Sequence, residues 1–126
     1  LNDFNARRQT AAARYDALLA DISGLQIPIR QPNSTHVFHQ YTIKVAGRQR
    51  NALQNYLRSR GVPSMVYYPL PMHRQPAYQH LPHSGQHFPV AEALCEAVLS
   101  LPMHTELTVN DQEYIAEMVR SFFAHA

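Results

Sequence analysis

The sequence predicts a single α+β domain in which a small sheet is covered by helices on one face. Apolar residues recur at helical spacing near both ends of the chain. The run from His36 to Val45 alternates between a largely apolar and a mostly polar face, as a half-buried strand does. A chain of 126 residues with 45% hydrophobic content is long enough to bury a core of its own.

Residues 3–22 are predicted to form the first helix. Their apolar side chains fall on one helical face, and Gly24 follows at the position where a glycine commonly ends a helix. Residues 27–35 are extended and broken by prolines, so we expect a connection there before the strand at 36–45. The apolar face of the helix holds Phe4, Ala11, Tyr15, Leu18 and Ile22.

A second helix and a second strand are expected next. Gly47 breaks the first strand, and the apolar residues that follow predict a helix from Ala52 to a stop at Gly61. Residues 64–67 read as a short apolar strand. Several prolines follow this strand, so we expect it to run into a rigid loop.

Two more helices complete the expected order. Apolar residues at helical spacing predict a third helix over 90–101, which Pro102 ends. Thr108 and Asp111 form a variant of the capping box, with Asp where Glu or Gln is usual. The wide apolar face that follows, up to Phe123, predicts an amphipathic last helix that docks on the rest of the domain.

Charge and cysteine content argue against several classes of protein. The formal net charge is +2, and nine acidic residues are spread among the 11 Lys and Arg, so no basic stripe indicates a nucleic-acid partner. The single cysteine, Cys95, excludes an internal disulfide and a thiolate-only metal site. Its helical context predicts a buried, inert thiol.

We expect a soluble, cytoplasmic protein with no membrane partner. No apolar run approaches the roughly 20 residues of a membrane span, and no signal peptide opens the chain. The chain begins at Leu1, inside a helical pattern and without an initiating methionine. We therefore expect it to be part of a longer protein.

The histidines suggest a metal site by number but not by context. His80, His83 and His87 have spacings of three and four, but Pro82 and Gly85 interrupt any helix that could align them. No nearby carboxylate or thiolate completes a ligand set, so we expect solvated loop histidines and no metal. A phosphate-binding loop is not indicated either, because the four glycines are isolated.

The stretch from Gly61 to Pro82 contains the candidate site. It has more hydrogen-bonding and aromatic groups than a connector needs, and its prolines reduce the entropy lost when a ligand binds. Because side chains alternate along a strand, one of its two adjacent tyrosines is expected to reach a cleft while the other packs into the core. The alternative is that the tyrosines only pack and the prolines only stiffen the loop. The candidate substrate-binding residues are Tyr67, Tyr68, His73 and Gln75.

Three motifs occur in a specific order in the second half of the chain. They are VYYPLPMHRQPAY at 66–78, FPVAE at 88–92 and LSLPMHTELT at 99–108. In the first half, NARR at 5–8 and HVFHQY at 36–41 belong to the same resemblance. Over nearly its whole length the chain is similar to the C-terminal domain of the DegT/DnrJ/EryC1/StrS family of sugar aminotransferases.

The resemblance implies the small α+β domain, with an antiparallel-rich sheet, that ends fold-type-I aminotransferases. The whole enzyme is then a homodimer that uses pyridoxal 5'-phosphate to move an amino group from glutamate to a keto carbon of a nucleotide-linked sugar. Residues 1–126 are by this resemblance the C-terminal domain alone, without a catalytic, cofactor-binding or metal-binding residue, and are expected to be inactive. The only lysine, Lys44, lacks the family's lysine motif, which belongs to the preceding large domain.

The chain departs from the family at one position of the candidate site. Many members have His-Tyr-Pro where this sequence has Tyr67-Tyr68-Pro69. The resemblance implies that both positions lie close to the substrate, so the departure bears on which sugar is accepted. Polysaccharide and antibiotic-sugar biosynthesis both stay open. So do two other functions, a free-standing ligand-binding or interaction module and the small domain of a related sugar dehydratase.

Overall fold

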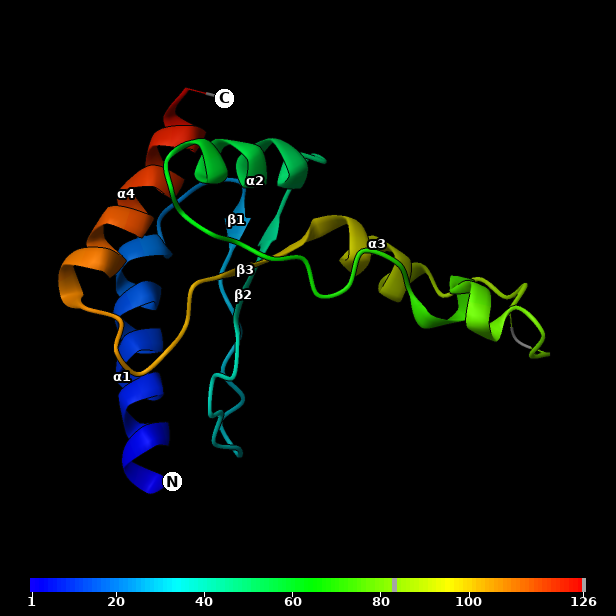
Figure 1. Ribbon diagram of the computed structural model, residues 1–126, viewed down its shortest axis with the longest axis horizontal. Helices are drawn as coiled ribbons and strands as arrows, with labels where there is room; N and C mark the ends of the chain where they lie inside the picture. The colour runs from blue at the N-terminus through cyan, green and yellow to red at the C-terminus, as the bar shows by residue number, and fades with distance from the viewer. Residues whose placement is uncertain (83, 126) are drawn as a thin grey trace.

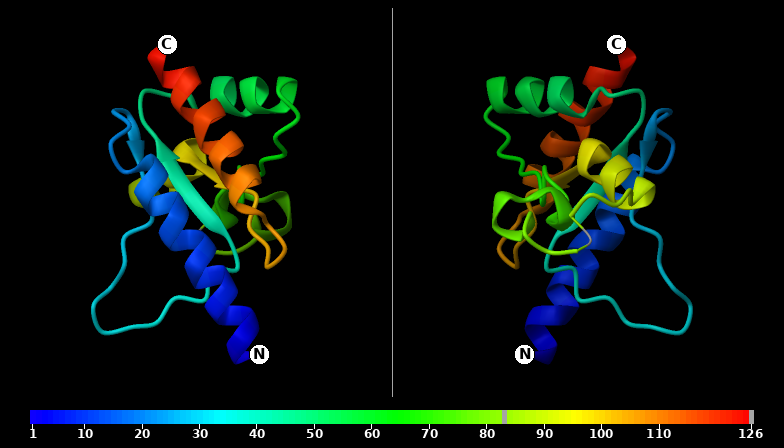
Figure 2. Two further views of the ribbon diagram at one scale, coloured as in Figure 1. Left: turned by 90° about the vertical axis from the view of Figure 1, so that its left-hand side faces the viewer. Right: turned by 90° about the vertical axis from the view of Figure 1, so that its right-hand side faces the viewer.

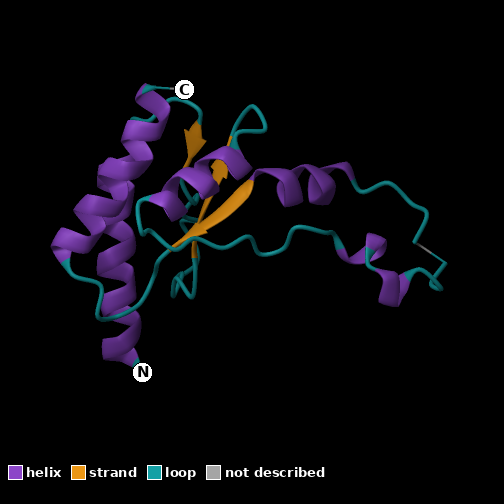
Figure 3. Ribbon diagram, turned by 45° about the horizontal axis from the view of Figure 1, so that its top comes forward, coloured by secondary structure: helices purple, strands orange, loops and turns teal. Residues whose placement is uncertain are grey.

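The computed structural model describes residues 1–82 and 84–125 and confirms the predicted α+β class. Its sheet has three strands in the order β1-β2-β3, and both neighbouring pairs are antiparallel. The elements are α1 (Asn2–Leu19), β1 (Leu25–Gln26), β2 (Tyr41–Val45), α2 (Arg50–Ser59), η1 (Met72–Arg74), η2 (Pro76–Tyr78), α3 (Pro89–Ala97), β3 (Val98–Leu101) and α4 (Val109–Ala124). Figures 1 and 3 show α1 and α4 side by side, with α3 projecting away from them.

One face of the sheet forms the core together with α1, α2 and α4. On β2, Tyr41, Ile43 and Val45 are buried, whereas Thr42 is half-buried and Lys44 is exposed, so the predicted alternation is confirmed over the observed strand. Figure 2 shows α1 and α4 running alongside β2. The helices contribute to this core Ala12, Tyr15, Leu19, Leu53, Leu57, Ile115, Ala116 and Val119.

Two buried tyrosines join α1 to the sheet. The ring centroids of Tyr15 and Tyr41 lie 4.9 Å apart. The Tyr15 hydroxyl donates to the carbonyl of Pro102 at 3.0 Å, and the Tyr41 hydroxyl donates to the carboxylate of Asp16 at 2.7 Å. Burial raises the pKa of both hydroxyls well above that of a free phenol. Both therefore remain protonated hydrogen-bond donors.

The predicted helix over 90–101 is wrong in its second half. The helix α3 ends at Ala97, and the next residues form β3, which pairs with β2. Leu99 and Leu101 alternate with Ser100 along β3 and enter the core. A short apolar run is compatible with a helix or with a buried strand, and here the pairing with β2 decides.

The strand predicted over 36–45 is confirmed only from Tyr41 onward. Phe38 adopts a φ of 49°, and its N–H group binds Nδ1 of His36 at 2.9 Å. Nη1 of Arg8 donates to the carbonyls of Phe38 and His39, both at 2.8 Å. These contacts turn the carbonyls toward α1, so the segment before β2 cannot join the ladder.

The strand predicted over 64–67 is reduced to one isolated bridge. Met65 and Ser100 exchange backbone hydrogen bonds of 3.0 and 2.7 Å. Pro63 and Pro69 lie on either side, and because proline has no N–H group the ladder cannot extend through them.

The remaining helix predictions hold with shifted ends. The first helix stops at Leu19, before the predicted end at 22, but Ile22 is still buried in the turn that follows. The capping box is confirmed. The Thr108 hydroxyl accepts from the Asp111 N–H group, and the Asp111 carboxylate accepts from the Thr108 N–H group, both at 3.1 Å. This box begins α4.

Residues 69–97, here termed the arm, extend away from the domain body. Figure 1 shows the chain leaving the sheet, passing through η1 and η2, and returning along α3 to β3. Among the arm residues that the structure describes, none in these three helices is buried. The described helices of the arm therefore contribute no buried side chain to the core.

We expect Gln112→Ala to destabilise the fold by about 1 to 3 kcal/mol, the cost of leaving buried polar partners unpaired. Gln112 is fully buried, its Nε2 donates to the carbonyl of Ala11, and its Oε1 accepts from Arg14, both at 2.8 Å. Urea denaturation of the variant provides the measurement. The exposed Gln79→Ala is the matched control and should leave the free energy of unfolding unchanged. Equal stabilities for the two variants would contradict this role of Gln112.

Candidate functional site

Residues 63–68, here termed the strap, run along the outer edge of β3. The Met65–Ser100 bridge ties the strap to this edge, and Gln54 of α2 donates to the Ser64 carbonyl at 3.2 Å. Hollows of about 300 and 410 Å³ lie beside the strap and at the base of the arm. Both volumes fall in the range of small-molecule sites.

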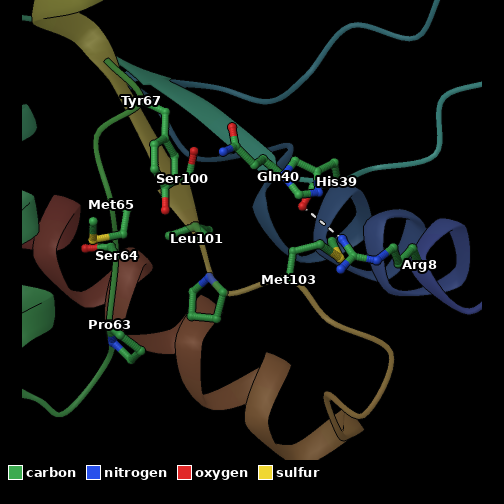
Figure 4. A pocket seen from close by; sticks show the side chains of 11 residues that line it. Arg8, His39, Gln40, Pro63, Ser64, Met65, Tyr67, Ser100, Leu101 and Met103 are labelled. Atoms are coloured by element: carbon green, nitrogen blue, oxygen red, sulfur yellow. Dashed lines mark hydrogen bonds between the residues drawn. The ribbon is translucent and has the colours of Figure 1, made fainter. Parts of the chain in front are cut away.

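The first hollow, here termed the edge cleft, lies between the strap, β3, the segment before β2 and α1. Figure 4 shows Tyr67 extending from the strap over β3, with Gln40 and His39 opposite and Arg8 at the far end. The wall is polar at several points, but none of its described residues is an Asp or Glu. The edge cleft is lined by Arg8, His39, Gln40, Pro63, Ser64, Met65, Tyr67, Ser100, Leu101, Pro102 and Met103.

The second hollow, here termed the arm hollow, lies between residues 68–75 and residues 88–95. It brings together three of the four predicted site residues, Tyr68, His73 and Gln75, whereas Tyr67 lines the edge cleft. Most of its other walls are apolar. They are formed by Leu70, Pro71, Met72, Phe88, Ala91 and Cys95.

The prediction that one tyrosine of the pair packs into the core is wrong. Tyr67 is 40% exposed and Tyr68 is 69% exposed. Their ring centroids lie 5.8 Å apart in an edge-to-face arrangement. The two side chains do not alternate as expected because the strap is not a paired strand, and the side chain that it turns toward the core is that of Val66. Each tyrosine therefore serves a different hollow.

Glu92, on α3, ties this helix to the earlier part of the arm. Its carboxylate accepts the Phe88 N–H group at 3.1 Å, contacts Nε2 of His73 at 3.1 Å, and pairs with Arg74 at 2.8 Å and with His87 at 3.3 Å. The His73 side chain is only 10% exposed and its ring packs on Phe88, with centroids 4.8 Å apart. One ring nitrogen of His73 is thus engaged within the arm, and the ring itself lines the arm hollow.

The importance of Glu92 was missed in the sequence predictions, which found no carboxylate close to the loop histidines. A local signal was present. An acid in the first turn after Pro89, which begins α3, can reach back to the N–H group of the residue before the helix. That an arginine and two histidines converge on this carboxylate depends on how the arm folds back.

Other candidate residues have simpler outcomes. Cys95 is half-buried at the arm hollow, so the prediction of a buried thiol is wrong. Across residues 1–82 and 84–125, no three His, Cys, Asp or Glu side chains are grouped as metal ligands. His83 lies outside the described residues, so the arrangement of the His80, His83 and His87 set is not tested. No described helix is both long and apolar enough to cross a membrane.

The chain matches the DegT/DnrJ/EryC1/StrS aminotransferase family over residues 1–120. A UDP-N-acetyl-3-dehydro-alpha-D-glucosamine 3-aminotransferase from Acidithiobacillus ferrooxidans is 39% identical over 93% of this chain and 30% of the relative. A pleiotropic regulatory protein from Geobacillus stearothermophilus is 38% identical over 99% of this chain and 34% of the relative. The chain thus spans about a third of the length of the curated relatives it matches.

Solved structures show the same fold. The aminotransferase TlmJ from Streptoalloteichus hindustanus matches with a TM-score of 0.90 and 32% identity, over 99% of this chain and 33% of that one. The NtdA structure from Bacillus subtilis, solved with its cofactor PMP bound, matches with a TM-score of 0.85 and 27% identity, over 96% of this chain and 28% of that one.

We expect the Glu92 carboxyl to titrate below pH 4.5, the value of an unperturbed glutamate. The Phe88 N–H group, then His73, Arg74 and His87, lower its pKa because they favour the charged form. Since the folded pKa is depressed, the anchoring contribution is complete above pH 4.5 and is lost as the pH falls through the folded pKa. An NMR titration of the carboxyl carbon provides the measurement.

Resonances of the arm should follow the same midpoint. In Glu92→Gln the pH-dependent change in the chemical shift of the Phe88 amide should disappear. In Glu96→Gln, on the same helix, this change should remain. A titration midpoint of the Glu92 carboxyl at or above pH 4.5 would show that this carboxylate does not anchor the arm. So would a Phe88 amide signal that does not change as Glu92 titrates.

Proposed function

The chain belongs to the DegT/DnrJ/EryC1/StrS aminotransferase family, and we propose that it is the C-terminal small domain of a longer aminotransferase. The observation behind this proposal is a family match over residues 1–120 in a chain that spans about a third of its relatives. The proposed reaction moves an amino group from glutamate to a keto carbon of a nucleotide-linked sugar. The Acidithiobacillus relative, named for a UDP-linked dehydro sugar, supports this substrate class.

The family depends on pyridoxal phosphate, and the PMP-bound relative agrees with this. The cofactor supplies the electron sink for amino transfer. The residues of this chain do not fit the role of its covalent anchor, because the only lysine, Lys44, is exposed on β2 and lines neither hollow. We therefore assign that lysine to a large domain and the substrate side of the site to residues 1–126.

Two groups of polar side chains are proposed to contact the substrate. Tyr67 offers the edge cleft a neutral hydroxyl, which can donate and accept hydrogen bonds with sugar hydroxyls. Tyr68 and Gln75 offer a hydroxyl and an amide to the arm hollow. His73 is proposed to line the substrate site through its ring while Glu92 fixes its orientation. The tyrosine at the first position cannot carry the positive charge of a histidine, so it favours uncharged partners.

The whole enzyme is proposed to be a cytoplasmic homodimer without a nucleic-acid or membrane partner. Family membership supports the dimer.

In the longer enzyme, Tyr67→Phe or Tyr68→Phe should lower kcat/KM. The decrease should correspond to a loss of about 1 to 3 kcal/mol of transition-state stabilisation, because a polar group of the substrate loses its hydrogen-bonding partner. His73→Ala should also lower kcat/KM and leave cofactor binding unchanged. Steady-state assays against a panel of keto-sugar nucleotides, with glutamate as donor, provide the measurement. Tyr78→Phe is the matched control, since Tyr78 lies on the arm but lines neither hollow. If all three site variants stay within about twofold of the parent, these residues are structural only.

The chain alone should neither catalyse amino transfer nor hold the cofactor covalently at a defined stoichiometry. After incubation with pyridoxal phosphate and borohydride reduction, mass spectrometry should find only weak, non-saturating labelling of Lys44, as for any exposed lysine. Lys44→Ala should remove this labelling without changing the fold. Saturable, stoichiometric labelling of Lys44 would instead make this residue a cofactor anchor.

A further inference from the structure

The edge cleft contains a cation that has no carboxylate partner. Arg8 is half-buried in its wall, and its Nη1 donates to the carbonyls of Phe38 and His39, both at 2.8 Å. Among the described residues, no Asp or Glu forms an ion pair with Arg8 or lines the cleft. By contrast Arg7, the preceding residue, faces two carboxylates, those of Asp3 and Glu106. The positive charge of Arg8 is therefore hydrogen-bonded but not neutralised.

The geometry leaves one edge of the guanidinium free for a ligand. A guanidinium has five N–H groups, and the two on Nη1 are the ones that bind the carbonyls. No hydrogen bond joins Nε or Nη2 to another described residue. These two nitrogens form the planar fork that binds a carboxylate or phosphate through two parallel hydrogen bonds.

The fork is also held in place before any ligand arrives. The carbonyl contacts fix the guanidinium from the side of the segment before β2, and its carbon lies 5.2 Å from the centroid of the Phe4 ring. Arg8 itself is carried by α1, an 18-residue helix of the domain body. Little side-chain entropy remains to be lost on binding. Figure 4 shows Arg8 beside Met103, with Gln40 and Tyr67 farther along the same cleft.

We propose that the edge cleft binds an oxyanion of a substrate at the fork of Arg8, with Gln40 and Tyr67 as neutral hydrogen-bonding partners for the uncharged part of the same substrate. The oxyanion is either the phosphate of the sugar nucleotide or a carboxylate of the amino donor. The two share the charge and planar oxygen pair that the fork recognises. Identifying the oxyanion as part of one of these two substrates rests on the proposed function. The binding of an oxyanion by this chain does not.

The first experiment uses the chain as it is, with inorganic pyrophosphate and glutamate as separate probes. Either probe should shift the Nε–H resonance of Arg8 in a saturable manner in NMR titrations. Arg8→Gln should weaken binding by about tenfold or more, the loss of a charge-assisted pair. Arg7→Gln removes the same charge one residue earlier and should leave the affinity unchanged.

Arg8→Gln also removes the hydrogen bonds to the carbonyls of Phe38 and His39. A second variant therefore tests the proposal with these contacts intact. Gln40→Glu is nearly isosteric, keeps Arg8 in place and puts a negative charge into the cleft. It too should weaken binding of the probe by about tenfold or more. Gln79→Glu, with the same charge change on the exposed arm, should bind like the parent. The proposal is overturned if neither probe binds saturably, or if Gln40→Glu binds as well as Gln79→Glu.

In the longer enzyme, Gln40→Glu distinguishes the two sources. A raised KM for the sugar nucleotide alone identifies the phosphate, and a raised KM for glutamate alone identifies the carboxylate. If the longer protein shows no amino transfer but the chain still binds pyrophosphate through Arg8, the proposed function fails and the oxyanion site stands. If amino transfer occurs and neither KM changes, the site has no role in substrate binding and the inference fails.

Discussion

Pairing between β2 and β3 is the constraint on which the rest of the structure depends. It joins residues 41–44 to residues 98–101, which lie 54 to 60 positions apart in the sequence. Leu99 and Leu101 enter the core from β3, and burying a leucine side chain contributes about 2 kcal/mol. Ser100, between them, binds the Thr42 hydroxyl at 2.8 Å and exchanges backbone hydrogen bonds with Met65. The strap and the return end of the arm are both positioned by this one strand.

The two hollows differ in chemistry because they are built from different parts of the fold. The edge cleft is walled by the domain body, where α1 and the segment before β2 bring in polar groups and one unneutralised cation. The arm hollow is walled by residues 68–75 and 88–95, which are mostly apolar there. The strap separates them, and its adjacent tyrosines reach one hollow each. A ligand that spans both hollows meets polar contacts at one end and an apolar wall at the other.

The arm has no buried residue among the helical segments that the structure describes, and so apolar burial does little to hold it. Its order depends instead on Glu92, which draws together the Phe88 backbone, His73 and Arg74. The Glu92 side chain is 20% exposed, so solvent screens these charges less than it does at an open surface. Polar contacts of this kind fix the direction of side chains. They therefore set where His73 lies along the arm hollow.

How far the fold follows from local pattern depends on the element. The helices α1, α2 and α4 were predictable, because each is long enough for its apolar face to repeat. The capping box at Thr108 was also readable, since both of its partners lie within one turn. The strand β3 was not, because its four residues fit a helix as well as a buried strand until β2 is present to pair with them.

The sequence by itself determined the α+β class, the helical core and the presence of a stiff polar segment at 61–82, because these depend on residue type and short-range spacing. Only the tertiary structure decided that Tyr67 and Tyr68 serve separate hollows and that Glu92 collects its partners from across the arm. It also decided that Arg8 lies in the wall of the edge cleft, 30 residues in sequence from the carbonyl of Phe38. Such contacts join residues that are far apart in the chain. The spacing of residues along a sequence does not specify them, because the packing of the core decides which distant segments meet.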